Sequence, residues 1–170
     1  MVVLLTGGSG CGKSSLAERV IARLSQEHRV YLATMKVSDK ESRLRVVRHR
    51  EARTGMGFVT LEREKAVGES ELSRDASVLL EDLPNLLANE MFDAGDPERI
   101  FPDLVCLAAQ VRHLVVVTGE VFSDGESCGE LTRRYMARLA ELNAQVARLA
   151  DCVSEVVCSL PVQLKGKLPC

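Results

Sequence analysis

A glycine-rich segment of eight residues near the start of the chain places the strongest constraint on its fold. It reads Gly7-Gly8-Ser9-Gly10-Cys11-Gly12-Lys13-Ser14 and fits G-x-x-x-x-G-K-S/T, the pattern of phosphate-binding loops. The apolar residues 2–5 precede it, as a buried parallel strand would, and a helix-forming run over 15–24 follows it. A glycine-rich turn that fits the pattern by chance would not need this context. The segment therefore predicts a P-loop between a strand and a helix.

The chemistry of such a loop follows from its residue types. Glycines let the backbone turn sharply, so that successive N–H groups converge on an anion. The helix that follows directs its positive end at the same place. We expect Lys13 to contact the β- and γ-phosphates as a catalytic residue and the Ser14 hydroxyl to bind Mg²⁺. All eight residues from Gly7 to Ser14 are therefore candidate nucleotide-binding residues.

Length and charge limit the class of protein. A chain of 170 residues is long enough for one domain with a proper core, so we expect a single domain over 1–170. The formal net charge of −2 argues against a broad surface for nucleic acid or membrane, and no apolar run approaches the length of a membrane span. Cleavage of the apolar N-terminus as a signal peptide would destroy the loop, which favours a cytoplasmic protein.

The cysteines point to the same compartment. None of the six belongs to a C-x-x-C pair, and most lie in apolar surroundings: Cys11, Cys106, Cys128, Cys152, Cys158 and Cys170. This pattern favours reduced thiols over a disulfide framework or a zinc site.

Apolar runs typical of buried strands alternate with helical patterns along the chain. The expected strands cover 2–5, 29–34, 58–62, 77–80, 113–118 and 153–160, with an extension of the last to 164 left open. The expected helices cover 15–24, 38–53, 84–92, 100–111 and 131–149. This alternation predicts an α/β fold, a P-loop NTPase-like (RecA-like) domain whose mostly parallel sheet carries helices on both faces.

Polar residues follow several of the expected strands, at the edge of the sheet where ligands of such folds bind. Besides the loop itself they are Thr34, the pair Glu81 and Asp82, and the pair Gly119-Glu120. P-loop enzymes use a carboxylate at the end of a neighbouring strand to hold Mg²⁺. Adjacent residues on a strand point in opposite directions, so only one of Glu81 and Asp82 is expected to face the nucleotide. The alternative is a surface acid that merely ends the strand.

A basic helix face supplies a second candidate for chemistry. Arg45, His49 and Arg53 are spaced by four residues, which places them on one face of the helix expected over 38–53. Guanidinium groups disfavour the charged form of a nearby imidazole, which keeps it neutral and nucleophilic. The arginines could also hold phosphate oxygens. Taken alone, the same pattern describes a solvated basic face with an incidental histidine.

With these motifs in place, the chain resembles the bifunctional adenosylcobinamide kinase / adenosylcobinamide-phosphate guanylyltransferase family of cobalamin biosynthesis, from residue 2 to about 165. The resemblance includes V-x-L-L-T-G-G-S-G-x-G-K-S at the start, Y-L-A-T at 31–34, R-x-x-x-H-R-x-x-R at 45–53 and F-V-T-L-E at 58–62. It continues through Leu79-Leu80-Glu81, Asn89, V-T-G-E-V at 117–121, Arg133, Asn143 and Lys165. The position of His49 relative to the Ala-Thr and T-x-E motifs is the most specific of these features.

The resemblance implies two reactions with a corrinoid substrate. In the first, a nucleoside triphosphate phosphorylates the aminopropanol hydroxyl of adenosylcobinamide. In the second, a histidine attacks the α-phosphorus of GTP, and the bound GMP passes to adenosylcobinamide phosphate to give adenosylcobinamide-GDP. Covalent catalysis of this kind divides one difficult transfer into two easier ones.

The resemblance also implies roles for individual residues. His49 would be the nucleophile, and Glu81 rather than Asp82 would bind Mg²⁺, although the generic P-loop pattern favours Asp82. The nucleotide would be contacted, beyond the P-loop, by Ala33, Thr34, Met35, Arg50, Glu51, Ala52, Arg53, Glu62 and Glu81. GTP and ATP would be substrates with Mg²⁺ as the cofactor, and the family assembles as a homotrimer.

The chain departs from the family pattern around 119–125, where Gly119-Glu120-Val121-Phe122 and Ser123-Asp124-Gly125 replace the usual residues. Phe58 stands where tryptophan is usual, and Pro84-Asn85 replace a threonine-rich helix start. Two rival functions therefore remain open, a plain small-molecule kinase with a structural His49 and a nucleotide-binding protein without turnover. A nucleic-acid motor is disfavoured by the balanced charge and the small size.

Overall fold

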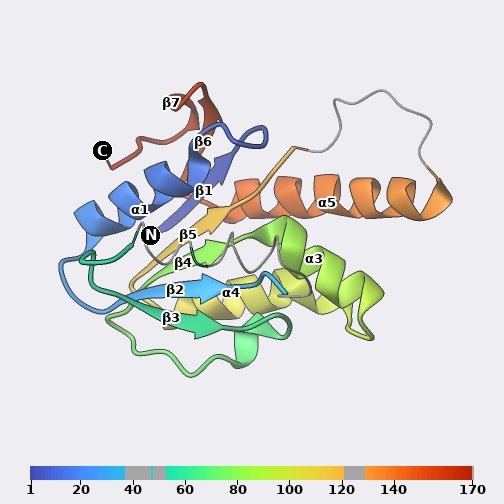
Figure 1. Cartoon of the computed structure of the whole chain (residues 1–170), viewed down its shortest axis with the longest axis horizontal. Helices are drawn as coiled ribbons and strands as arrows, with labels where there is room; N and C mark the ends of the chain where they lie inside the picture. The colour runs from blue at the N-terminus through green and yellow to red at the C-terminus, as the bar shows by residue number, and fades with distance from the viewer. Residues whose placement is uncertain (37–46, 48–52, 121–128, 170) are drawn as a thin grey trace.

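One β-sheet organises the chain in the computed structural model, which describes residues 1–36, 47, 53–120 and 129–169 (Figure 1). Its seven strands lie in the order β3-β2-β4-β5-β1-β6-β7. The strands are β1 (Val2–Thr6), β2 (Arg29–Ala33), β3 (Phe58–Glu62), β4 (Ser77–Glu81), β5 (His113–Val117), β6 (Cys152–Val157) and β7 (Leu160–Lys165).

The first six of these strands run parallel, and only β7 is antiparallel to its neighbour. The carboxyl ends of β1, β2, β4 and β5 therefore meet at one edge of the sheet. The register pairs Ala33 at the end of β2 with Glu81 on one side and Glu62 on the other. The mostly parallel sheet expected from the sequence is confirmed.

The prediction of a single last strand was wrong beyond residue 157. β6 and β7 form a hairpin whose two turn residues, Cys158 and Ser159, have positive φ angles of 49° and 66°. Tight hairpin turns of this geometry usually carry Asn-Gly or a related pair. Because Cys-Ser is not a recognisable turn signal, the apolar pattern was read as continuous.

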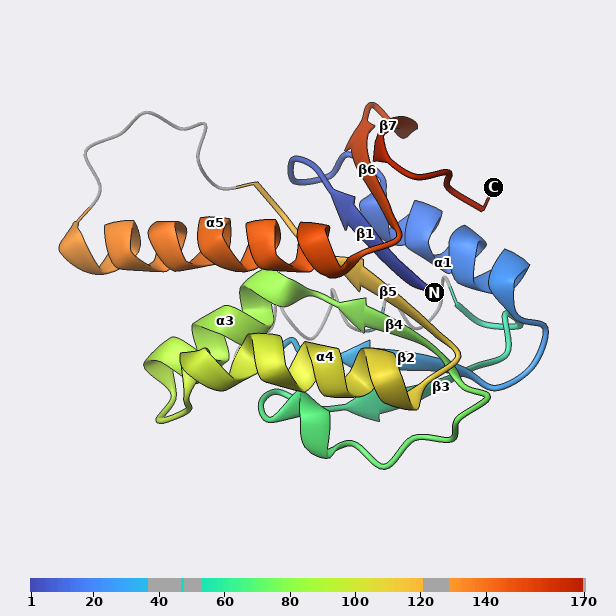
Figure 2. The same ribbon diagram turned by 180° about the vertical axis from the view of Figure 1, so that it is seen from behind.

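Helices cover both faces of the sheet, as predicted. Figure 2 is seen from the side of α3 (Leu83–Phe92), α4 (Ile100–Gln110) and α5 (Glu130–Leu149), and α1 (Lys13–Leu24) lies on the opposite face. Alternate strand residues feed two cores, since successive side chains point to opposite faces. Val3 and Leu5 belong to the core that includes α1, whereas Val2 and Leu4 belong to the core that includes α3, α4 and α5. Two 3-10 turns, η1 (Val67–Glu69) and η2 (Pro97–Arg99), complete the described elements.

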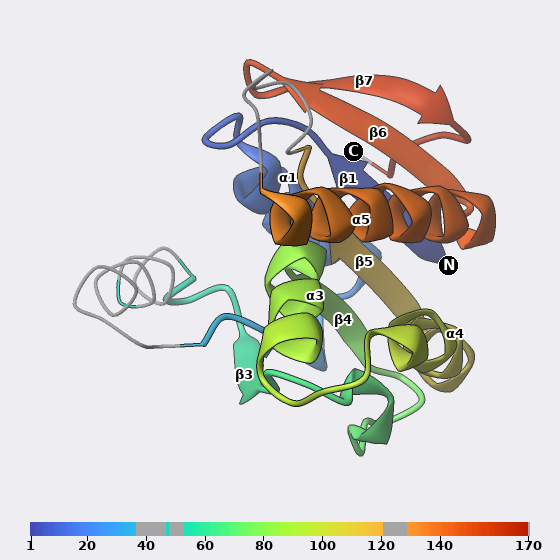
Figure 3. The same ribbon diagram turned by 90° about the vertical axis from the view of Figure 1, so that its right-hand side faces the viewer.

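The long helix α5 follows its predicted apolar stripe only in part. Leu139, Leu142 and Val146 are fully buried against the sheet. Leu131, near the amino end, is 59% exposed, because this end of α5 extends past the sheet (Figure 1). Figure 3 is seen from this side, with α5 in front of β1 and β5. Periodicity located the helix, but it did not show where the sheet beneath it ends.

The helix predicted over 38–53 lies largely outside the described residues. Within the part of the chain that is described, no helix has the length and apolar character needed to cross a membrane. A parallel sheet with β1 near its centre, the glycine loop directly after β1 and helices on both faces make up a RecA-like α/β fold.

Candidate nucleotide-binding and catalytic site

The glycine loop connects β1 to α1 and has a backbone that requires glycine at two positions. Gly7 and Gly12 have φ angles of 142° and 95°, which side-chain-bearing residues rarely adopt. A Cβ atom on Gly7 would lie 2.5 Å from the Val156 carbonyl oxygen, and one on Gly12 would lie 2.7 Å from the Ser159 hydroxyl. The turn of the β6–β7 hairpin therefore packs directly against the loop, where the Ser159 N–H also donates to the Cys11 carbonyl at 2.9 Å. No sequence motif marks these hairpin contacts.

Lys13 begins α1, and its ammonium group turns back over the loop. Its Nζ donates to the carbonyl oxygens of Gly7 at 2.8 Å and Gly8 at 2.6 Å and lies 3.7 Å from the Cys11 sulfur. The first N–H groups of α1 have no partners within the helix, so they and the ammonium present positive charge at the same place. This arrangement suits a polyphosphate.

Ser14 and Glu81 form the second part of the site. The Ser14 hydroxyl, in the first turn of α1, donates to Glu81 Oε1 at the end of β4, at a distance of 2.6 Å. Burial raises the pKa of Glu81 to about 7; the hydrogen bond from Ser14 and the charge of Lys13 oppose this shift, whereas the charges of Asp82 and Glu18 add to it. The other oxygen, Oε2, is buried and has no hydrogen-bond partner among the described residues. A buried carboxylate with an unpartnered oxygen beside a hydroxyl fits the oxygen ligands that Mg²⁺ prefers.

Asp82, the alternative to Glu81, is engaged elsewhere. Its carboxylate caps α3 by accepting from the Asn85 backbone N–H at 2.9 Å and from the Asn85 side-chain amide at 2.8 Å. Such caps satisfy N–H groups that a helix leaves unpaired at its start. Of the two adjacent acids, it is Glu81 that contacts Ser14.

Glu81→Gln is expected to weaken Mg²⁺ binding by at least about 10-fold, because loss of a group that only orients a metal ligand already has an effect of that size. The amide keeps the size of the side chain but removes its charge. Titration of nucleotide turnover with Mg²⁺ measures the effect. Asp82→Asn is the matched control, because asparagine caps a helix as well as aspartate does. An equal shift in both variants would contradict the assignment of Glu81.

Thr34 lies at the end of β2 but does not present its side chain to the loop. It is fully buried, and its hydroxyl bonds to the backbone of Glu81 and Asp82 at 2.8–3.0 Å. Its carbonyl oxygen accepts from the Asn89 side-chain amide at 2.8 Å. Thr34 therefore ties the ends of β2 and β4 to α3, and its neighbours Ala33 and Met35 are half-buried beside it.

The remaining predicted residues are divided between three places. Glu62 is exposed at the end of β3, next to Ala33. Arg53 is buried against α1 and β2, where its guanidinium lies 3.4 Å from the centre of the Tyr31 ring. Arg45, His49, Arg50, Glu51 and Ala52 lie outside the described residues.

A cavity of about 500 Å³ opens elsewhere, along β3 and the turn before it. Its lining includes Arg53, Thr54 and Gly57 as well as Phe58 and Thr60 of β3. Phe58 begins β3, so this end of the cavity lies at the edge of the sheet opposite the P-loop.

Comparison with known proteins identifies the family of the chain. A model of the family described as cobinamide kinase / cobinamide phosphate guanyltransferase matches residues 3–164. The bifunctional adenosylcobalamin biosynthesis protein CobP of Pseudomonas aeruginosa is 32% identical over 96% of this chain and 97% of its own length. The protein CobU of Escherichia coli, described by the same words, is 30% identical over 97% of this chain and 100% of its own length.

The fold has a relative among solved structures as well. The flagellar accessory protein FlaH of Methanocaldococcus jannaschii aligns with 99% of this chain and 79% of its own, with a TM-score of 0.53 and 9% identity. At that identity the likeness concerns the fold alone. The family match over nearly the whole length, together with the two curated relatives, shows that the chain belongs to the cobinamide kinase / cobinamide phosphate guanyltransferase family.

Proposed function

We propose that one P-loop site in this chain serves both activities of its family and that guanylyl transfer proceeds through GMP bound to His49. The family acts as cobinamide kinase and cobinamide phosphate guanylyltransferase in adenosylcobalamin biosynthesis. One observation in this structure supports the proposal for this chain. Lys13, Ser14 and Glu81 meet beside the loop amides at the carboxyl edge of the sheet, as nucleotide chemistry requires.

In the kinase step, the aminopropanol hydroxyl oxygen of adenosylcobinamide attacks the γ-phosphorus of ATP or GTP. The new O–P bond forms as the bond from the γ-phosphorus to the β–γ bridging oxygen breaks, and a nucleoside diphosphate leaves. The hydroxyl proton passes to solvent or to a nearby base. Lys13 and the loop amides hold the phosphate oxygens and stabilise the charge that develops on the leaving group.

In the transferase step, a ring nitrogen of His49 attacks the α-phosphorus of GTP. The N–P bond forms as the bond to the α–β bridging oxygen breaks, and pyrophosphate leaves. A phosphate oxygen of adenosylcobinamide phosphate then attacks the same phosphorus and releases the imidazole, which gives adenosylcobinamide-GDP. Arg50, Glu51, Ala52 and Arg53, with Ala33, Thr34, Met35 and Glu62, are the proposed nucleotide contacts beyond the P-loop.

Mg²⁺ is the proposed cofactor, held by Ser14 and Glu81, and it would neutralise phosphate charge in both steps. The buried, unpartnered oxygen of Glu81 supports this assignment. No group of three or more metal-binding side chains occurs among the described residues. Phosphate oxygens of the nucleotide and water would supply the other ligands, as is usual for Mg²⁺.

We further propose that residues 1–170 act as one catalytic domain in a cytoplasmic homotrimer. The apolar side chains of β7 support an oligomer. Leu160, Val162 and Leu164 alternate along this edge strand and are 69%, 46% and 60% exposed, and exposed apolar patches often mark interaction sites.

The test is a reconstitution with purified protein, Mg²⁺ and adenosylcobinamide. With ATP or GTP we expect adenosylcobinamide phosphate, and with GTP we expect adenosylcobinamide-GDP and pyrophosphate, each identified by mass. Phosphate transfer without GMP transfer would identify a plain kinase. Tight GTP binding with neither product would identify a binding protein without turnover.

A further inference from the structure

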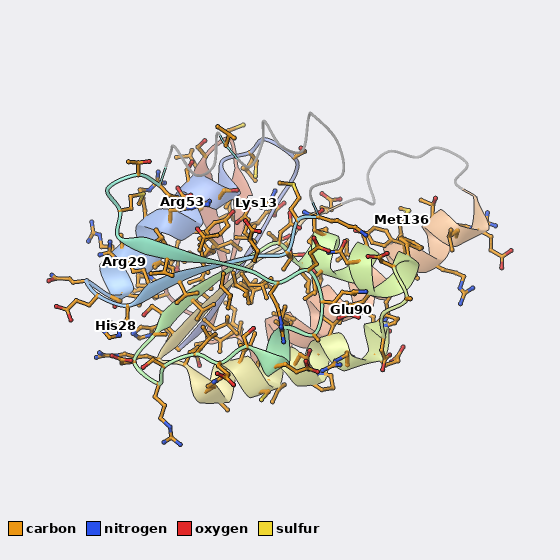
Figure 4. The ribbon with its side chains drawn as sticks, turned by 60° about the horizontal axis from the view of Figure 1, so that its bottom comes forward. Lys13, His28, Arg29, Arg53, Glu90 and Met136 are labelled. Atoms are coloured by element: carbon orange, nitrogen blue, oxygen red, sulfur yellow. The ribbon has the colours of Figure 1, made fainter. Side chains whose placement is uncertain are left out.

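An exposed apolar surface lies where α3 and α5 extend past the carboxyl ends of β2 and β4 (Figure 1). It is formed by Phe92 at the end of α3 and by Leu131 and Tyr135 in the first two turns of α5. Phe92 and Leu131 are 50% and 59% exposed, and Tyr135 is half-buried. Figure 4 labels Met136, the residue after Tyr135, on this projecting part of α5. We call the three side chains the α3–α5 face.

Contacts between the two helices join these side chains into one surface. The rings of Phe92 and Tyr135 lie 6.1 Å apart between their centres and are tilted by 34°. Leu131 and Tyr135 are four residues apart, which places them on the same side of α5. Aromatic side chains offer a large contact area, and exposed apolar patches often mark binding sites. The α3–α5 face is therefore a contiguous apolar surface rather than a set of scattered exposed residues.

Tyr135 connects this face to the phosphate site. Its hydroxyl donates to the Pro84 carbonyl oxygen at 3.1 Å. Pro84 follows Glu81 by three residues, which span at most about 11 Å. Burial and, after it, the charge of Asp82 raise the pKa of Tyr135 to about 12, so the hydroxyl lies within reach of the charge at the start of α3. The face therefore begins beside the end of β4, where Glu81 is the proposed Mg²⁺ ligand.

The acceptor of the proposed reactions needs an apolar surface at this place. A corrinoid is a broad macrocycle with a largely hydrocarbon skeleton, and cobinamide carries its reacting hydroxyl on a short aminopropanol arm. When that hydroxyl reaches the γ-phosphate beside Lys13, the macrocycle has to lie beyond the carboxyl edge of the sheet, within the length of the arm. Sites for ligands of this kind are lined mainly by apolar and aromatic side chains. The exposed apolar residues of β7 lie instead on the last strand of the sheet.

We propose that the α3–α5 face binds the corrin ring of adenosylcobinamide and of adenosylcobinamide phosphate. Phe92 and Leu131 contact the ring, and Tyr135 holds the Phe92 side chain in place. The inference rests on the proposed function, because it takes the corrinoid as the substrate of this chain. It assigns acceptor-binding residues that the P-loop motif does not include.

The experiment measures the Kd of adenosylcobinamide by equilibrium dialysis of the purified protein, followed by the absorbance of the corrinoid, so that no turnover is needed. Phe92→Ala and Leu131→Ala should each raise this Kd by about 5- to 10-fold, because each removes apolar area that the ring would cover. In the reaction with ATP, the KM for adenosylcobinamide should rise by the same factor with little change in kcat. Affinity for GTP and labelling from α-labelled GTP should stay within about twofold, since neither involves the corrinoid.

Two further variants make the test specific. Phe92→Tyr keeps an aromatic ring at this position and should bind adenosylcobinamide within about twofold of the wild type. Val105→Ala is the matched control, because Val105 is an apolar residue of α4 that is 41% exposed outside this face. It should bind like the wild type.

The outcomes separate this inference from the proposed function. If the wild type binds no adenosylcobinamide, both are wrong. If the wild type binds it and Phe92→Ala and Leu131→Ala bind it equally well, only the inference is wrong. A smaller assembly by light scattering with an unchanged Kd would identify the face as a contact between copies of this chain, and an equal loss of GTP affinity would indicate a general effect on the fold; either result overturns the inference. Thermal unfolding shows whether each variant is folded, and if Phe92→Ala does not fold, Leu131→Ala decides alone by the same criteria.

Discussion

Alanine at position 49 is expected to abolish covalent attachment of GMP, with labelling from α-labelled GTP reduced by more than about 10³-fold. The proposed mechanism has one nucleophile for the α-phosphorus, and alanine has no atom that can form the N–P bond. Wild-type label should be lost in acid and kept in base, as expected for phosphorus bound to imidazole nitrogen. Phosphorylation of adenosylcobinamide by ATP should continue, because that step uses the substrate hydroxyl as the nucleophile.

His28 provides the control for this experiment. It lies before β2, is about half exposed and pairs with Asp75 at 2.9 Å, away from the carboxyl edge of the sheet. His28→Ala should label like the wild type. Label that survives in His49→Ala would refute the assignment of the nucleophile, and loss of label in His28→Ala as well would point to a general effect on the protein.

Much of the fold could be predicted because its signals are local. Short apolar runs between helical patterns located β1, β2, β4 and β5, and the glycine loop identified β1 as the strand that precedes the phosphate site. The β6–β7 hairpin was missed because Cys158 and Ser159 adopt left-handed backbone geometry without a residue that favours it. The exposed start of α5 was missed because the extent of the underlying sheet depends on the whole fold.

The candidate site, like the fold, could be predicted from the sequence only in part. The spacing within the P-loop predicted Lys13 and Ser14 as nucleotide-binding residues, and the alternation of strand side chains predicted that only one of Glu81 and Asp82 faces the proposed Mg²⁺ site. Choosing between these acids from the structure required knowing that Asp82 caps α3, which is a contact with Asn85.

The burial of Glu18 was not predicted, for a different reason. A glutamate within an amphipathic helix reads as a solvated residue, and its burial beside Arg53 depends on β2 and on the turn over 53–57. Its spacing of four residues from Ser14 was the one sequence signal that could have placed it on the face of α1 that carries Ser14.

Lys13→Ala is expected to reduce GTP binding and both transfer reactions by about 10³-fold. The estimate follows from Coulomb's law, since a unit charge about 4 Å from a phosphate charge contributes about 4 kcal/mol at an effective dielectric constant of 20. Lys13 is placed for this role, because its ammonium already lies over the loop at the carbonyls of Gly7 and Gly8. Those two carbonyl groups can bond to water in the variant, so the fold should be little affected.

The measurement is GTP affinity by calorimetry, followed by the labelling and ATP assays on the same samples. Lys167→Ala, at an exposed position after β7, removes the same charge far along the chain and should change none of the three. Unchanged GTP affinity in Lys13→Ala would remove the P-loop from the mechanism. The contrast with His49→Ala is the more specific result. His49→Ala should lose only GMP transfer, whereas Lys13→Ala should lose both GMP transfer and phosphorylation. This difference is expected if both reactions use one phosphate site and only GMP transfer uses the covalent nucleophile.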